Sequence, residues 1–151
     1  MIGWLLDTNV ISEIASPKCD PRVAAWARGE AEDRLFISIL SLGEYDKGIA
    51  NLPLDAAARQ RFGAAVLALE MRFAGRIVSL SDAVVRRWGR ISGETQRIAG
   101  KAPPVIDTLL AAAAVEHDLY LVTRNIKDVC DSGAAIFDPW ADDPVAFPLS
   151  P

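Results

Sequence analysis

The chain has 151 residues, of which 51% are hydrophobic and 24% are charged, and its formal net charge is −4 at pH 7. These values are those of an ordinary folded protein and exclude an intrinsically disordered chain, which combines low hydrophobicity with high net charge. A chain of this length buries roughly two thirds of its unfolded surface, enough for the core of one domain. We therefore expect a single domain over 1–140 and a C-terminal tail over 141–151.

The sequence indicates neither a membrane nor an oxidising compartment. The apolar run at 1–6 is too short for a membrane span, which needs ~20 apolar residues, and it lacks the basic segment of a signal peptide. Cys19 and Cys130 are the only two cysteines, far apart and without the companions of a zinc site or a disulfide framework. We expect a cytoplasmic protein with no membrane partner.

Positive charge is concentrated in the middle of the chain. Residues 55–101 contain nine basic side chains and four acidic ones, a balance of +5, while the remainder carries −9. Such a segment can form a basic surface for a polyanion, because phosphate contacts depend on local Lys and Arg rather than on overall charge. The same side chains equally fit the solvated outer faces of amphipathic helices.

In chain order, the apolar pattern predicts strands alternating with helices. The continuous apolar run at 2–6 is typical of a parallel strand buried on both faces. Asp20 and Pro21 predict the start of a helix, because a capping side chain followed by a first-turn proline favours one. The helices are expected at 9–15, 22–29, 39–50, 54–73, 83–98 and 105–117, and the further strands at 35–38, 77–80, 119–123 and 135–137.

This order predicts an α/β fold with three layers, α/β/α, around a mainly parallel sheet of four to five strands. In the helix at 54–73, Phe62, Val66, Leu69 and Phe73 recur at the spacing of a face that packs on a core. The segment after Asp138 contains four of the nine prolines. It is expected to be an extended tail that wraps the domain, touches a partner or stays mobile.

Acidic and amide side chains recur where these elements would bring them to one edge of the sheet. Asp7 ends the first strand, Glu44 lies in the helix after the second, Asp107 opens the helix before the fourth, and Asn125 and Asp128 follow the fourth. Carboxylates that converge repel one another unless a cation holds them, so convergence would create a metal site. Each position alone also has a simpler explanation, such as a helix cap, a favourable helix-dipole contact, an exposed glutamate or a turn.

Small residues lie beside two of these acids. Gly43 precedes Glu44 inside a helix at a propensity cost of about 1 kcal/mol, which a close backbone approach would justify. Ala111 and Ala114 follow Asp107 on its own helix face, so that face is small enough to pack tightly.

Four separated strings now stand in order: LLDTNVISE at 5–13, SILSLGE at 38–44, VID at 105–107 before an alanine-rich helix ending in Glu116 and His117, and LVTRN at 121–125. In order and spacing they resemble the PIN domain, and more narrowly the VapC/FitB-type toxins of toxin–antitoxin pairs, from Met1 to about Trp140. The resemblance implies a metal-dependent endoribonuclease, usually a homodimer. It also implies a small DNA-binding, VapB-like antitoxin that forms a heterooligomer with the toxin and blocks its active site.

Carried over to this chain, the resemblance makes Asp7, Glu44 and Asp107 the metal-binding acids. Many PIN domains have an aspartate where this chain has Asn125, so Asp128 either fills the fourth position or only supports the site. The residue types fit the chemistry independently, since Mg²⁺ and Mn²⁺ prefer oxygen ligands and can activate a bound water for attack on a phosphodiester.

The neighbours of these residues are assigned supporting roles. Thr8 and Asn9 are expected to hold the carboxylate that precedes them, as supplementary groups of the metal site. Arg124 either contacts the scissile phosphate or packs against the edge of the sheet.

Four alternatives differ in how well they fit the sequence. His117, the only histidine, lies ten residues after Asp107 and about 280° around their helix, which argues against paired-histidine ribonucleases and a Ser-His-Asp triad. An aspartyl-phosphate phosphatase could use Asp7 as its nucleophile but needs a second aspartate where this chain has Asn9. A non-catalytic PIN-fold binding module is permitted by the changed fourth position.

Overall fold

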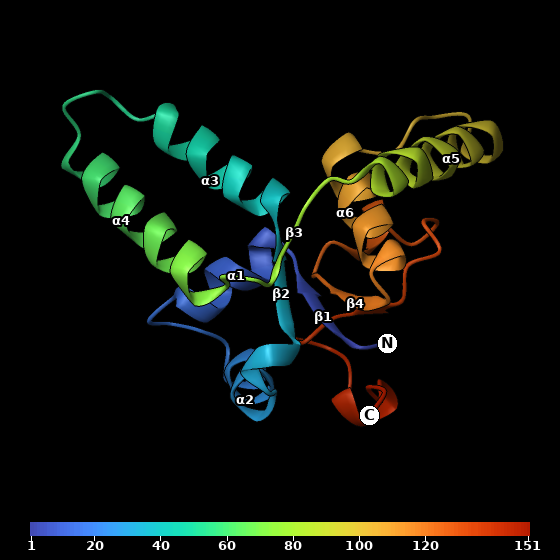
Figure 1. Ribbon diagram of the computed structural model, residues 1–151, viewed down its shortest axis with the longest axis horizontal. Coiled ribbons are helices and arrows are strands. Elements are labelled where there is room, and N and C mark those ends of the chain that lie inside the picture. The colour runs from blue at the N-terminus through green and yellow to red at the C-terminus, as the bar shows by residue number, and fades with distance from the viewer.

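The computed structural model describes all 151 residues. It contains five strands and six helices (Figure 1), together with short 3-10 helices at Glu32–Arg34, Ile126–Asp128 and Pro144–Ala146. Each predicted helix and strand is present, with ends within three residues of those expected. In chain order they are β1 (Gly3–Leu6), α1 (Thr8–Ala15), α2 (Pro21–Gly29), β2 (Leu35–Ser38), α3 (Ile39–Ala50), α4 (Ala57–Arg72), β3 (Ile77–Val78), α5 (Asp82–Ala99), α6 (Val105–Glu116), β4 (Leu119–Val122) and β5 (Ile136–Phe137).

The five strands form one fully parallel sheet in the order β3-β2-β1-β4-β5, with β1 at its centre. Leu6, the last residue of β1, is in register with Ile37 of β2 and with Val122, the last residue of β4. The carboxyl ends of the three central strands therefore meet at one edge. This confirms the predicted α/β fold and brings the polar residues after β1 and β4 together.

Helices cover both faces of the sheet. Successive side chains of a strand point to opposite sides, so each strand contributes to a hydrophobic core on each face. Trp4 and Leu6 lie in one hydrophobic core with Trp26 of α2, whereas Leu5 lies in the other. In that second core, Ala111–Ala114 of α6 are completely buried. Their small side chains let α6 pack close to the sheet and hold its first turn at the carboxyl edge.

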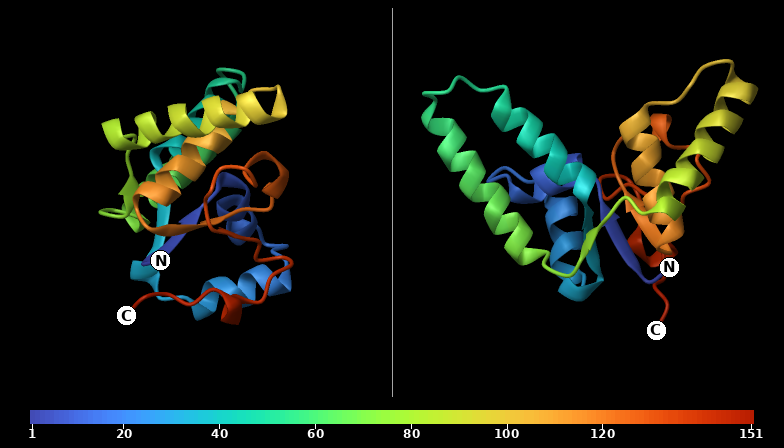
Figure 2. Two further views of the ribbon diagram at one scale, coloured as in Figure 1. Left: turned by 90° about the vertical axis from the view of Figure 1, so that its right-hand side faces the viewer. Right: turned by 45° about the horizontal axis from the view of Figure 1, so that its top comes forward.

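Two helical hairpins, α3/α4 and α5/α6, project from the sheet and diverge from one another (Figure 2). The predicted apolar face of α4 is only partly correct. Phe73 is buried at its end, and Val66 and Leu69 are partly buried against the core, but Phe62 is 45% exposed. The reason is that α4 packs along α3 rather than flat on the sheet. None of the helices is both long and apolar enough to span a bilayer.

The C-terminal tail follows the first of its three expected behaviours and packs on the domain. Phe147 stacks on Phe137 and Tyr120, with ring centroids 4.9 and 5.5 Å apart. The Tyr120 hydroxyl donates to the carbonyl of Pro148 at 3.1 Å, and the backbone N–H of Ser150 donates to that of Met1 at 2.8 Å. The tail thereby closes one side of the core.

Replacing Phe147 by alanine should lower the free energy of unfolding by about 2 kcal/mol, because a half-buried aromatic side chain is lost from the core. Urea denaturation measures the change. Val145, which is 85% exposed in the same segment, supplies the control, since Val145→Ala should alter stability by less than about 0.5 kcal/mol. Equal effects of the two substitutions would show that the tail does not pack as described.

Arginines anchor the end of α4 to the start of β2. Arg76 donates to the backbone carbonyls of Glu32, Leu35 and Arg72, and its guanidinium lies 4.7 Å from the centre of the Phe73 ring. Arg72 makes two hydrogen bonds of 2.9 Å to the Glu32 carboxylate. The hydrogen bonds from Arg72, assisted by Arg76, lower the pKa of Glu32 to about 2.

Replacing Glu32 by glutamine should cost about 0.5–1 kcal/mol at neutral pH, a small effect because the carboxylate is half exposed. A folded-state pKa below the ordinary 4.5 means that this contribution is present above pH 4.5 and is lost as the pH falls towards 2. Urea denaturation of both proteins between pH 7 and pH 3 should therefore show the difference narrowing below pH 4.5. A difference that stays constant over this range would contradict the assigned ion pair.

Candidate active site

Asp7 occupies the carboxyl end of the central strand, where only 9% of the residue is exposed. Its Oδ1 accepts a hydrogen bond of 2.7 Å from the backbone N–H of Thr8. Its Oδ2 accepts two more, each of 2.7 Å, from the side chains of Asn9 and Thr123. Asp7 is also the N-cap of α1, so its carboxylate serves the helix as well as lying at the edge of the sheet. The carboxylate is fixed in a single orientation at the edge of the sheet.

Thr123 is the hub of this arrangement, because its hydroxyl connects three of the surrounding groups. The sequence did not predict this role. Its buried hydroxyl donates to Asp7 and accepts from the Asn9 amide at 3.1 Å and from the backbone N–H of Asn125 at 2.9 Å. The signal was available in principle, because Thr123 directly follows β4, the neighbour of the strand that ends at Asp7. Only the pairing of the two strands makes that adjacency visible.

Glu44 reaches the site from α3. The Thr8 hydroxyl lies 3.1 Å from Glu44 Oε1 and 2.9 Å from the Oγ of the buried Ser41. The explanation offered for Gly43 is wrong, because a Cβ added there would meet no atom within 4 Å. Gly43 faces open space, and nothing in the structure requires a glycine at that position.

Asp107 and Asn125 complete the group. The Asn125 amide donates to Asp107 Oδ1 at 3.1 Å, so Asn125 lies at the site and presents a neutral amide. Asp7, Glu44, Asp107 and Asn125 all line one open cleft of about 270 Å³, together with Thr8, Asn9, Ser12, Ile106 and Leu110. Four of the five acidic and amide residues that the sequence predicts at one edge therefore lie together, and the fifth, Asp128, does not.

The other candidates lie elsewhere. Asp128 is not among the residues of this cleft and lines a separate one with Thr108 and Lys127. The Arg124 guanidinium stacks on Trp140, 5.1 Å from the ring centre, which agrees with packing at the sheet edge. His117 follows the last turn of α6 and caps it, away from the cleft.

Charge repulsion is evident within the cleft. Burial raises the pKa of Asp7, and the negative charge of Asp107 adds to the rise, while the hydrogen bonds from Thr123, Thr8 and Asn9 oppose it. Partial burial also raises the pKa of Glu44, helped by the charges of Asp7 and Asp107. A bound cation would relieve both effects, because it favours the ionised carboxylates.

The donors of the cleft fit a hard divalent cation. They are carboxylate, amide and hydroxyl groups with no thiolate or imidazole, a set that suits Mg²⁺ or Mn²⁺ better than zinc. No three acidic, histidine or cysteine side chains lie close enough to enclose an ion by themselves. An ion held here would therefore keep several water ligands, as Mg²⁺ usually does in proteins.

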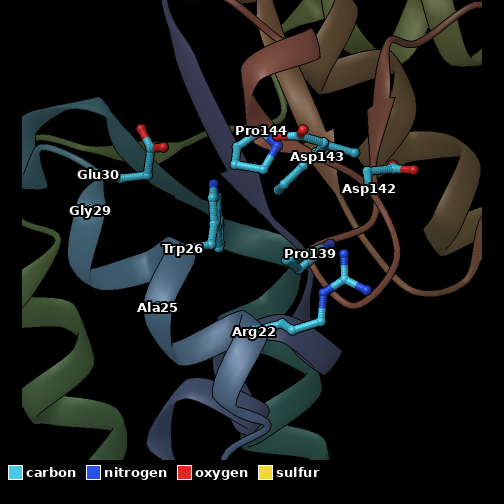
Figure 3. A pocket seen from close by; sticks show the side chains of 10 residues that line it. Arg22, Ala25, Trp26, Gly29, Glu30, Pro139, Asp142, Asp143 and Pro144 are labelled. Carbon is cyan, nitrogen blue, oxygen red and sulfur yellow. The ribbon is translucent and has the colours of Figure 1, made fainter.

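A larger hollow of about 510 Å³ lies between α2 and the tail (Figure 3). Its walls include Arg22, Trp26, Glu30 and Asp142, and it shares no residue with the acidic cleft. The Glu30 carboxylate accepts a hydrogen bond of 2.8 Å from the indole of Trp4, so it serves the packing of the core.

The sequence profile of the PIN domain matches residues 4–127. The chain belongs to the PIN domain family. Among curated proteins it is 31% identical to Toxin FitB of Neisseria gonorrhoeae, over 91% of this chain and 99% of that one. It is 29% identical to VapC ribonuclease Y4jK of Sinorhizobium fredii, over 90% and 96% of the two chains. These relatives confirm the resemblance inferred from the four strings.

Solved structures agree. A structure of FitAB bound to a DNA fragment superposes with a TM-score of 0.81 at 28% identity, covering 93% of this chain and 97% of that chain. FitAcB from Neisseria gonorrhoeae gives a TM-score of 0.80 at 30% identity, with coverages of 91% and 98%. The PIN fold thus extends over nearly the whole chain, including the elements that carry all four cleft residues.

Replacing Thr123 by valine should destabilise the protein by about 1–3 kcal/mol, because the buried Asp7 carboxylate loses a donor and two N–H groups lose their acceptor. Urea denaturation without metal measures this. Thr123→Ser keeps the hydroxyl and should retain most of the stability. If valine and serine were equivalent, Thr123 would not be the hub of the cleft.

Proposed function

We propose that this PIN-domain protein is a metal-dependent endoribonuclease that hydrolyses RNA phosphodiester bonds with an activated water. The observation that carries the proposal is the convergence of Asp7, Glu44 and Asp107, from three distant parts of the chain, in one cleft of oxygen donors. The cleft contains no thiol or imidazole, and in this proposal the attacking group is a water molecule rather than a side chain. The relation to a VapC ribonuclease supports RNA as the substrate.

Each side chain has a distinct role in this proposal. Asp7 and Asp107 would hold a Mg²⁺ or Mn²⁺ ion, and such an ion lowers the pKa of a bound water and offsets charge on the leaving oxygen. Asn9 and Thr123 keep the Asp7 carboxylate turned towards the cleft through its Oδ2. The raised pKa of Glu44 suits a group that binds the ion or takes a proton from the attacking water.

The fourth position is assigned to Asn125. Its amide holds Asp107 at 3.1 Å, so it orients a ligand without adding a further negative charge. Asp128 lies in the neighbouring cleft, so this proposal gives it no part in holding the ion. Because this chain has Asn125 where many PIN domains have an aspartate, its cleft has one carboxylate fewer. That loss would weaken the binding of a second metal ion more than the binding of the first.

We infer a toxin role, in a heterooligomer with a VapB-like antitoxin, from the relation to Toxin FitB. An apolar groove of about 500 Å³ between α1, α3 and α4 supports it, because Ser12 and Glu44 line both this groove and the acidic cleft. A segment bound in the groove would end at the acids and block them. The exposed Leu67 and Met71 of α4 are available to the antitoxin or to a second copy in a homodimer. We infer that this assembly acts in the cytoplasm, because its proposed substrate and the proposed antitoxin are found there.

The test measures cleavage of a labelled RNA in Mn²⁺ by the natural chain and by its Asp107→Asn variant. A reaction in EDTA gives the background. Cleavage should fall by at least about 100-fold, more than the loss typical of groups that only support a metal ligand. Melting in EDTA should occur at the same or a slightly higher temperature, because a like charge has been removed. That second measurement separates lost chemistry from lost folding.

Asp128→Asn is the matched control and should retain cleavage within a few-fold. Loss of activity in the control but not in Asp107→Asn would overturn the assignment of the site. A chain that binds RNA but never cuts it in Mn²⁺ would instead be the non-catalytic PIN-fold module that Asn125 permits. Release of phosphate from a monoester would favour the aspartyl-phosphate phosphatase.

A further inference from the structure

The fold uses only some of the positive charge concentrated in 55–101. Arg59 donates to the carbonyls of Ile49 and Ala50, and Arg87 pairs with Glu116. Arg72 and Arg76 bind Glu32, as described above. Five basic side chains remain exposed and form no hydrogen bond or ion pair within the chain; they are Arg61 on α4 and Arg86, Arg90, Arg97 and Lys101 on or just after α5.

Four of these five lie along one side of α5. At about 100° per residue, Arg86, Arg90 and Arg97 fall within an arc of roughly 40°, and Lys101 follows two residues after the end of the helix. The partly or fully buried residues Val84, Trp88, Ile91 and Thr95 lie on the opposite side, where α5 packs on α6. We name Arg86, Arg90, Arg97 and Lys101 the α5 basic row.

The composition of the row favours a polyanion over a protein. The residue nearest the arc between Arg90 and Arg97 is Gly93, about 20° outside it, so no apolar side chain interrupts the row, whereas a protein interface usually has an apolar centre. Two acids of α5 flank the row, Asp82 and Glu94, each about 40° from its arc, and neither forms an ion pair with it. At ~1.5 Å per residue the row is roughly 22 Å long, enough to face several phosphates of one strand.

The row leads to the acidic cleft. Its last member, Lys101, lines a hollow of about 450 Å³ with Val105 and Thr108, the residues on either side of the 106–107 pair. Lys127, Asp128 and Asp131 line the same hollow, so its charges are mixed. Figures 1 and 2 show α5 running outward to a loop that returns directly into the start of α6. That first turn carries Asp107, so one short loop connects the outer end of the row to the acidic cleft.

We propose that the α5 basic row binds the phosphates of an RNA segment outside the cleft, so that the chain prefers RNA longer than the few nucleotides at the acids. The inference rests on the proposed ribonuclease function and names the surface that engages the substrate. Contacts to phosphates set the position of the RNA without reading its sequence, so the row would add affinity rather than choose the cut.

The binding experiment uses a 24-nucleotide single-stranded RNA with a fluorescent label, measured by anisotropy in EDTA so that nothing is cut. The triple variant R86Q/R90Q/R97Q should bind about 10-fold more weakly at 0.1 M salt, and its log-log salt slope should shrink by about 2, as expected for three lost contacts on a single strand. The variant R86K/R90K/R97K, which keeps the charges, should bind within about 3-fold of the natural chain.

The matched control K18Q/R28Q/R61Q removes three positive charges from exposed positions elsewhere. It should bind RNA within about 3-fold of the natural chain, because overall charge alone acts weakly at this salt concentration. Equal losses in the two glutamine triples, or no loss in either, would overturn the proposal. Poly-glutamate binding with the same dependence on the three arginines would also overturn it, by making an acidic protein the partner.

Cleavage in Mn²⁺ separates this inference from the function on which it rests. In R86Q/R90Q/R97Q, KM for the 24-nucleotide RNA should rise about 10-fold at unchanged kcat, while a 5-nucleotide RNA should be cut as by the natural chain. If both RNAs are cut normally, the row proposal fails and the nuclease stands. If nothing cuts RNA but the row still controls its binding, the nuclease fails and the row stands.

Discussion

The hydrogen-bonded carboxylate of Asp7 is the interaction on which the rest of the site depends. A buried carboxylate is costly unless donors satisfy it, and here Thr8, Asn9 and Thr123 supply three. Hydrogen bonds to a charged group contribute about 1.5–3 kcal/mol each, enough to offset part of the burial and of the repulsion by Asp107. The fold therefore holds a negative charge where a divalent cation gains most from it.

That position follows from the way the elements are built. Helices cover both faces of this parallel sheet, so polar side chains find room at its carboxyl edge. The polar residues after β1 and β4 meet there. The alanines of α6 bring Asp107 close, and the α3 helix brings Glu44. The two hairpins diverge above this edge (Figure 2). Glu44 of one hairpin and Asp107 of the other both line the acidic cleft.

Local patterns in the sequence were enough to predict the helices and strands and the shared edge of Asp7, Glu44 and Asp107. Apolar runs and strand ends are encoded within a few residues. What depended on distant pairing was missed. Thr123 becomes a hub only through the register of β4 on β1, and Phe62 is exposed because α4 leans on α3. Composition alone left the tail undecided, since the partners of Phe147 lie in β4 and β5. Likewise, nothing in the sequence separated Asn125 from Asp128 as neighbours of Asp107.

The central claim is that the acidic cleft binds a divalent cation, and anomalous diffraction from crystals of the chain soaked in Mn²⁺ tests it most directly. The account predicts a strong anomalous peak between Asp7 and Asp107, completed by water ligands, and none in the neighbouring cleft beside Asp128. An empty acidic cleft at saturating Mn²⁺, with well-ordered carboxylates, would contradict the account.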